Sequence, residues 1–136
     1  MYPEEMVAPM KEELTTVGFD ELLTAEAVDE PISKEGTALV MVNSVCGCAA
    51  ANARPAVSLA SKHSKRPDRL TTVFAGVDQE AVAQARKHML PYPPSSPSIA
   101  LFKDGKLVHF IERHHIEGRP AEMIAENLTS AFDEFC

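Results

Sequence analysis

The amino-acid sequence predicts an α/β fold with a central mixed sheet of about four strands and helices on both faces. Three observations lead to this prediction. Segments typical of strands alternate with segments typical of helices, which favours parallel strands joined by helical crossovers. The segment 37–42 is continuously apolar, as expected for a strand buried on both faces. A hairpin signal at 103–105 adds antiparallel strands.

The length and composition agree with a compact α/β protein. A chain of 136 residues is long enough to bury a core of its own, so we expect a single domain over 1–136. Its first part, about 1–35, is predicted to be an N-terminal helical extension. With 45% hydrophobic and 24% charged residues, the chain is typical of globular rather than disordered proteins.

The charge and the N-terminus exclude several classes of function. A net charge of −7 speaks against binding to nucleic acids or to anionic membranes, because both require a basic surface. The first residues lack the basic segment and apolar run of a secretory signal, and no apolar stretch has the length of a membrane span. We therefore expect a cytoplasmic protein with no nucleic-acid or membrane partner.

Two helices are predicted before the first strand. Apolar residues recur at helical spacing over 3–17, and Gly18 follows as a stop signal. The hydroxyl of Thr24 is suited to cap a second, short helix that ends before Pro31.

The apolar strand leads directly to the tripeptide Cys46-Gly47-Cys48. After the tripeptide, the alanine-rich segment 49–64 predicts a helix that Pro55 kinks or divides. This helix is expected to bury Val57, Leu59 and Ala60.

A second strand is predicted at 70–77, where β-branched residues are frequent. Asp78 is then expected to cap a helix that runs to about Leu90. A parallel strand-helix-strand-helix arrangement follows from this order.

The last third of the chain predicts a hairpin and a helix. Strands at 98–102 and 106–111 flank Lys103-Asp104-Gly105, and Gly118 and Pro120 precede a final amphipathic helix. The complete order, β-α-β-α-β-β-α with the last two strands joined as a hairpin, is the connectivity of the thioredoxin core.

The cysteine pair is the strongest indication of function. Three cysteines are too few for a secreted disulfide framework, and clustered cysteines in a reducing compartment indicate redox or metal chemistry. If Cys46 lies between a strand and a helix, free backbone N–H groups and the helix dipole stabilise its thiolate. Cys46 is therefore the predicted nucleophile, and Cys48 is the predicted resolving thiol. The short spacing over Gly47 favours an oxidant, an isomerase or a remover of thiol adducts over a strong reductant.

Two other interpretations of the pair stay open at this point. Cys46 and Cys48 are the start of a zinc or iron–sulfur site if His114, His115 or Cys136 completes it. Alternatively, they are small buried residues without chemistry. Adjacent histidines on a strand point in different directions, which favours surface positions, so we predict no metal. The terminal Cys136 is interpreted as incidental, with an accessory redox thiol as its alternative.

A second, weaker signal is the Ser96-Pro97 dipeptide immediately before a predicted strand. A proline there lacks the N–H that a sheet needs, and a cis peptide bond becomes plausible.

Several segments together resemble the bacilliredoxin family, which consists of thioredoxin-like bacterial proteins with a Cys-Gly-Cys motif. They are the opening Tyr2-Pro3 helix, the segment from Val42 to Ala49, the loop from Tyr92 to Ser98, and the segment from Phe110 to His114. The resemblance covers nearly the whole chain. It implies a thiol–disulfide oxidoreductase that removes bacillithiol or a similar low-molecular-weight thiol from protein cysteines, with disulfide isomerase activity as a further expectation.

The resemblance also implies partners and site residues. The partners are oxidised or S-thiolated proteins and the small thiol, and no cofactor is expected. By position, Cys46 is the attacking thiol and Cys48 its partner. Pro97 takes the place of the cis-proline of the thioredoxin fold, and the backbone of Ser96 binds an extended substrate segment. Gly47 completes the expected substrate-binding set.

Overall fold

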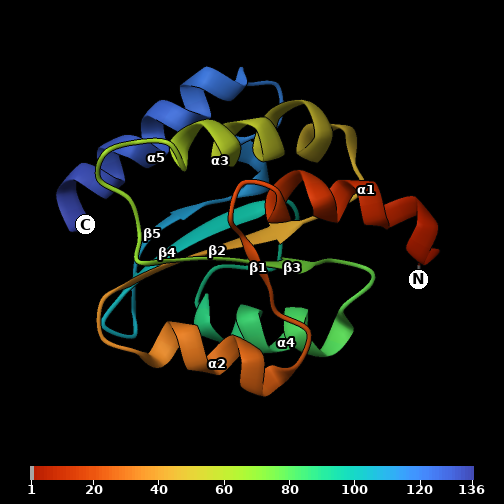
Figure 1. Ribbon diagram of the computed structural model, residues 1–136, viewed down its shortest axis with the longest axis horizontal. Coiled ribbons are helices and arrows are strands. Elements are labelled where there is room, and N and C mark those ends of the chain that lie inside the picture. Colours follow the sequence, from red (N-terminus) through yellow and green to blue (C-terminus); the bar gives the residue numbers. More distant parts are fainter. Residues whose placement is uncertain (1) are drawn as a thin grey trace.

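A five-stranded mixed sheet lies between two layers of helices in the computed structural model, which describes residues 2–136 (Figure 1). The strands are β1 (Asp20–Glu21), β2 (Thr37–Asn43), β3 (Arg69–Phe74), β4 (Ser98–Lys103) and β5 (Lys106–Ile111). Their order in the sheet is β1-β3-β2-β4-β5. Strands β1 and β2 each pair in parallel with β3, whereas β4 is antiparallel to both of its neighbours, β2 and β5. The predicted α/β architecture with helices on both faces is confirmed.

Helices α1, α3 and α5 cover one face of the sheet, and α2 and α4 cover the other (Figure 1). Among residues 2–136, no helix combines the length and the apolar character that crossing a membrane requires. The helical elements are α1 (Glu4–Thr15), α2 (Ala25–Ser33), η1 (Ala49–Ala53), α3 (Arg54–Ala60), α4 (Gln79–His88), η2 (Arg113–His115) and α5 (Ala121–Phe135).

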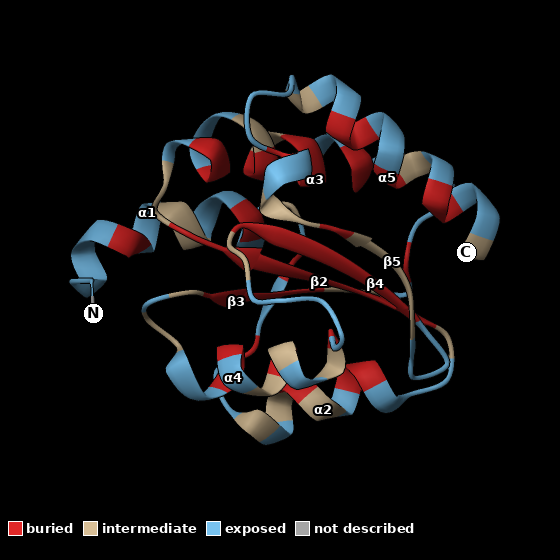
Figure 2. Ribbon diagram, turned by 180° about the vertical axis from the view of Figure 1, so that it is seen from behind, coloured by how far each residue is buried: buried red, intermediate tan, exposed pale blue. Residues whose placement is uncertain are grey.

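Strand β2 is buried along its whole length, as predicted (Figure 2). Successive side chains of a strand point to opposite faces, and β2 supplies both cores in this way. Leu39 and Met41 pack under α3 and α5, whereas Val40 and Val42 pack against α2 and α4. The element that precedes the cysteines is therefore held from both sides.

Strand β1 was not predicted, because two acidic residues carry no strand pattern. Its backbone extends the sheet beyond β3, and the N–H of Leu22 continues the pairing by donating to Thr72 O at 2.9 Å. The flanking Phe19 and Leu22 are buried and anchor the segment. Elements α1, β1 and α2 occupy the segment predicted as an N-terminal extension, and the division of the chain at about residue 35 stays a prediction.

The predicted end of the second helix before Pro31 is wrong. Helix α2 continues to Ser33 with Pro31 buried inside it, since the packing of Ile32 in the core offsets the one backbone hydrogen bond that proline cannot make. The predicted cap is confirmed, because the N–H of Ala27 donates to the hydroxyl of Thr24 at 3.1 Å.

Two side-chain predictions along the following helices need correction. Asp78 is the N-cap residue of α4, as predicted, but its side chain makes no capping hydrogen bond; its carboxylate lies 3.4 Å from Lys11 Nζ of α1 instead. Leu59 of α3 is 45% exposed, whereas Val57 and Ala60 are buried. Residues three apart share a face of a helix, and a residue two positions from Val57 does not.

The predicted hairpin of β4 and β5 is confirmed. Asp104 and Gly105 form its turn with φ angles of 51° and 82°. Positive φ at both central residues is the conformation that a tight type I′ hairpin turn requires. Glycine tolerates this region freely, and aspartate tolerates it better than most residues.

A buried arginine connects α1, the end of β2 and the start of α3. Arg54 is 3% exposed, and its Nη1 donates to Asn43 Oδ1 at 3.0 Å and to Ser44 O at 2.8 Å. Its Nε lies 3.1 Å from a carboxylate oxygen of Glu13. The amide of Asn43 donates to Met10 O of α1. Because a buried charge is tolerated only when it is paired, this network fixes the chain immediately before the cysteines.

Replacement of Arg54 by methionine is expected to lower the free energy of unfolding by about 2–3 kcal/mol, because Ser44 O loses its side-chain donor in the interior, Asn43 Oδ1 keeps only the N–H of Ser44, and Glu13 loses its cation. Urea denaturation of the reduced protein measures the change. Lys34→Met is the control, since the ion pair of Lys34 with Glu30 is exposed and its loss should cost less than about 0.5 kcal/mol. Equal, small losses in both variants would show that the buried network does not stabilise the fold.

Candidate functional site

Cys46 and Cys48 lie directly after β2, at the start of the next helical segment. Cys46 is partly exposed, Cys48 is 9% exposed, and their sulfur atoms are 2.7 Å apart. The N–H groups of Ala49 and Ala50 donate to Cys46 O at 3.1 and 3.2 Å, which are the first helical hydrogen bonds of the segment. The predicted order of buried strand, cysteine pair and helix is therefore confirmed.

The helical segment begins with a wide turn that the sequence analysis did not predict. Residues Ala49–Ala53 form a π-helix, and the N–H of Arg54 donates to Ala49 O five positions earlier. Such turns re-aim the side chains that follow them and occur often at functional sites. The regular helix α3 starts at Arg54, so the segment divides next to Pro55, as predicted.

The surroundings of Cys46 favour its thiolate. Partial burial raises the pKa of Cys46, but hydrogen bonds from the Cys48 thiol, the Ser44 hydroxyl and the Ala49 N–H outweigh it, and the charge of Arg113 acts in the same direction. The Ser44 hydroxyl donates to Cys46 Sγ at 3.2 Å. As a result, the pKa of Cys46 lies below its ordinary value.

The surroundings of Cys48 have the opposite effect. Burial raises the pKa of Cys48, and both the hydrogen bond that it shares with Cys46 and the negative charge on Cys46 raise it further. The Cys46 thiol is therefore the stronger acid of the two. The pair is chemically asymmetric although the two residues are only one position apart.

Cys46 lines an open cavity of about 210 Å³. One wall depends on Gly76, which has a φ of 83° and lies under the ring of Tyr2. A Cβ atom at Gly76 would lie 2.8 Å from that ring, so a larger residue there would displace Tyr2, and the positive φ favours glycine at this position. The lining residues are Tyr2, Ser44, Val45, Cys46, Ala75, Gly76, Ser96 and Arg113.

The loop before β4 reaches the same cavity through Ser96. The Ser96–Pro97 peptide bond is cis, and Pro97 is buried. Gly47 is exposed and does not line the cavity, and an added Cβ there would meet open space. The structure thus brings Ser96 to Cys46, while the substrate-binding roles of Gly47, Ser96 and Pro97 stay predictions.

Three residues of the site were missed by the sequence analysis: Ser44, Arg54 and Arg113. Ser44 stands two positions before Cys46 and lies in the segment from Val42 to Ala49 that resembles the family, so both its nearness and that motif were available signals. Arg113 is far from the cysteines in sequence; its Nη1 donates to Ser96 O at 3.2 Å, which ties it to the loop. Arg113 also belongs to a segment that resembles the family, but that segment does not show that Arg113 borders the same cavity as Cys46.

The described residues contain no group of three or more His, Cys, Asp or Glu side chains arranged to hold a metal ion. Thr37, the first residue of β2, is among the groups that influence the pKa of Cys136, whereas the cysteine pair follows the last residue of that strand. At about 3.3 Å per residue, the separation is roughly 20 Å. Cys136 therefore cannot complete a site with Cys46 and Cys48 in this structure.

The adjacent histidines lie on the turn η2 rather than on a strand, because the sheet ends at Ile111. Their rings are close, with 4.0 Å between centroids, so the expectation that His114 and His115 point apart on a strand is wrong. Both are exposed, as expected, and His114 Nδ1 lies 3.1 Å from a carboxylate oxygen of Glu112.

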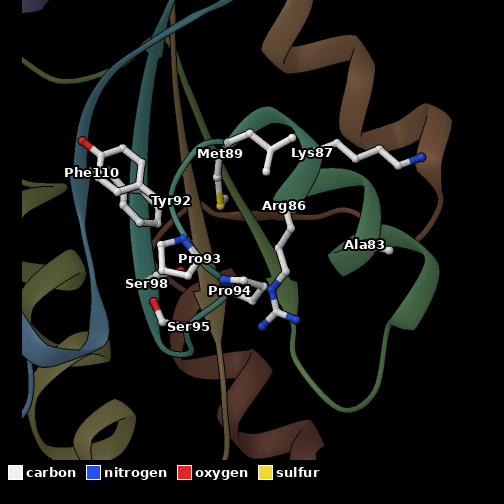
Figure 3. Close-up of a pocket in the computed structure, with 11 residues that line it drawn as sticks. Ala83, Arg86, Lys87, Met89, Tyr92, Pro93, Pro94, Ser95, Ser98 and Phe110 are labelled. Carbon is white, nitrogen blue, oxygen red and sulfur yellow. The ribbon is translucent and has the colours of Figure 1, made fainter.

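A second cavity, of about 180 Å³, adjoins the same loop but contains neither cysteine of the pair (Figure 3). The ring of Tyr92 packs on Phe110 along one side, with 4.6 Å between ring centroids. Ser95 and Ser98, on either side of the cis peptide bond, belong to its lining. Of the two cavities, only the first is bordered by Cys46.

Comparison with known proteins assigns this chain to a family. The family model described as disulphide isomerase matches residues 2–136. A bacilliredoxin of Cytophaga hutchinsonii is 63% identical over 98% of this chain and 99% of its own length. A bacilliredoxin of Koribacter versatilis is 53% identical over 100% of this chain and 94% of its own length.

Among solved structures, a thioredoxin variant from Halobacterium salinarum superimposes with a TM-score of 0.59 over 85% of this chain and 88% of that one. At 16% identity, this similarity establishes the thioredoxin fold alone. Because the family model and the relatives both extend over nearly the whole chain, this protein belongs to the bacilliredoxin family.

Proposed function

We propose that the protein is a thiol–disulfide oxidoreductase that removes bacillithiol or a similar low-molecular-weight thiol from protein cysteines. The observation that carries the proposal is the asymmetric pair: an accessible Cys46 with a lowered pKa, 2.7 Å from a buried Cys48 with a raised pKa. An accessible thiolate attacks, and a neighbouring thiol completes the exchange. The names of the relatives, bacilliredoxins, agree with this chemistry.

The first step transfers the small thiol to the enzyme. The Cys46 thiolate attacks the sulfur of the small thiol in a mixed disulfide on a client protein. A Cys46–small-thiol disulfide forms, the original disulfide bond breaks, and the client cysteine leaves as a thiolate that takes a proton from solvent. The client is thereby reduced.

The second step releases the small thiol. Cys48 loses its proton and attacks Cys46 Sγ, which forms the Cys46–Cys48 disulfide and expels the small thiolate; the thiolate is then protonated. Two further molecules of small thiol return the two electrons to the pair and leave as their own disulfide. No metal or cofactor takes part in these steps.

The substrate-binding roles belong to this proposal as well. The backbone of Ser96 beside Pro97 binds an extended client segment, and the exposed Gly47 leaves room for it next to Cys46. The partners are oxidised or S-thiolated proteins. We expect the protein to act in the cytoplasm, where small thiols keep such pairs reduced.

Disulfide isomerisation is a second candidate activity, favoured by the description of the matching family model. It uses the same first attack, now on a protein disulfide. When another client thiol, rather than Cys48, attacks the mixed disulfide on Cys46, the client is rearranged without net oxidation.

Replacement of Cys46 and replacement of Cys48 are expected to block different steps of the reaction. Cys46→Ser abolishes removal of the small thiol, because no nucleophile remains at the cavity. Cys48→Ser still accepts the small thiol but retains it on Cys46, which mass spectrometry detects as an adduct of the intact protein. Full turnover by Cys46→Ser, or retention on Cys48 in the wild-type protein, would contradict the assignment.

The pH dependence of alkylation tests the role of Ser44. The rate follows the fraction of thiolate, so wild-type Cys46 should reach half of its maximal rate at a lower pH than it does in the urea-unfolded protein. Ser44→Ala removes a donor to the thiolate, which raises the pKa and moves the midpoint to higher pH. Peptide-level mass spectrometry separates Cys46 from the other cysteines.

Ser61→Ala is the matched control for Ser44→Ala. Ser61 is also buried, but its hydroxyl donates to Ser58 O at the far end of α3, so its loss should leave the midpoint unchanged. Identical midpoints for wild type and Ser44→Ala would mean that the hydroxyl does not stabilise the thiolate.

A further inference from the structure

Among residues 2–136, Arg113 is the one arginine, lysine, aspartate or glutamate that lines the Cys46 cavity. It follows β5 as the first residue of η2. Nη1 donates to Ser96 O at 3.2 Å, and Nη2 lies 3.3 Å from a carboxylate oxygen of Glu117. A guanidinium has five N–H donors, so these two bonds leave several for another partner.

The positive charge of Arg113 acts on the reacting atoms. It favours the thiolate at Cys46 and at Cys48. Cys46 and Arg113 line the same cavity, so a group joined to Cys46 through a disulfide can lie in the space that Arg113 also borders. The cavity is open and has a volume of about 210 Å³, so it can hold the part of an adduct next to its sulfur while the remainder extends into solvent.

The positive charge of Arg113 is opposite in sign to the net charge of the protein. The net charge of −7 repels anions at long range, so any preference for an anionic ligand must come from the cavity itself. The existing partner of Arg113 is readily exchanged: side chains of Arg113 and Glu117 are 43% and 59% exposed, and exposed pairs of this kind contribute little to stability. A ligand carboxylate in the cavity would bind the same guanidinium of Arg113, and it would be better shielded from water than Glu117 is.

We propose that Arg113 forms a carboxylate-binding subsite beside Cys46, so that the enzyme prefers small-thiol adducts that carry a carboxylate over neutral or cationic ones. This inference rests on the proposed function and specifies its substrate class. The carboxylate binds the guanidinium, and the adduct sulfur is thereby presented to Cys46. The Cys46 thiolate then forms the new disulfide with that sulfur, and the client cysteine leaves as a thiolate.

The test compares three mixed disulfides on one reporter protein, made with mercaptopropionate, mercaptoethanol and cysteamine. These thiols are similar in size but are anionic, neutral and cationic. Mass spectrometry follows removal of each by the reduced full-length protein at neutral pH and low salt. Each rate is divided by the rate with a free small dithiol, which corrects for the intrinsic reactivity of the adduct.

The wild-type protein is expected to process the anionic adduct about tenfold faster than the neutral one, and the cationic adduct more slowly than either. Arg113→Gln should lose this ranking. Arg113→Lys should retain part of it, because lysine keeps the positive charge but cannot form the two parallel hydrogen bonds of a guanidinium. Arg66→Gln is the control. Arg66 lies before β3, at the end of the sheet opposite the cysteines, and should keep the wild-type ranking.

The outcomes separate this inference from the function on which it rests. If Arg113→Gln slows all three adducts by one common factor, Arg113 only supports the thiolate or the Ser96 loop, and the subsite is overturned. Equal corrected rates for the three adducts with wild type overturn it too. If wild type removes none of the adducts, the proposed function itself fails.

Discussion

The buried guanidinium of Arg54 is the interaction on which the geometry of the cysteine pair depends. It binds two acceptors at the end of β2, on Asn43 and Ser44, and it pairs with Glu13 of α1. A charge at this depth is stable only with such partners. Because two of these partners are Asn43 and Ser44, the backbone that follows β2 must keep the path that brings them to Arg54. Ser44 is held by this contact and in turn holds Cys46. The position of the reactive sulfur thus depends on the buried contacts of Arg54.

The chemical difference between the two cysteines follows from their placement one residue apart at the start of a helix. Cys46 faces the cavity and receives hydrogen bonds that stabilise a negative charge, whereas Cys48 points into the core under α3 and α5. Burial disfavours the charged form of Cys48, and the thiolate on Cys46 disfavours it further. One thiol is therefore ready to attack while the other is kept protonated until it is needed.

The sheet brings the remaining parts of the site together. Strand β4 runs antiparallel to β2 with Val42 opposite Ser98, so the residues just before β4 lie beside the residues just after β2. Ile99 of β4 pairs with Ile111 of β5, so the chain that follows β5 lies at the same end of the strands as the chain that precedes β4. In this way Ser96 and Arg113 meet Cys46 although both are about fifty or more positions away in sequence.

The sequence by itself determined the order of elements, because its signals are local: an unbroken apolar run for β2, an Asp-Gly turn for the hairpin, and a cysteine pair between strand and helix. It also determined the family, through motifs spread along nearly the whole chain. It did not reveal β1 or the passage of α2 through Pro31, where packing in the core overrides weak local preference. Only the tertiary structure decided which groups surround the thiols, because the contacts of Arg54 and Arg113 join segments that no periodicity links. The resulting pKa difference between Cys46 and Cys48 is a property of those contacts, and it exists only when the sheet has assembled.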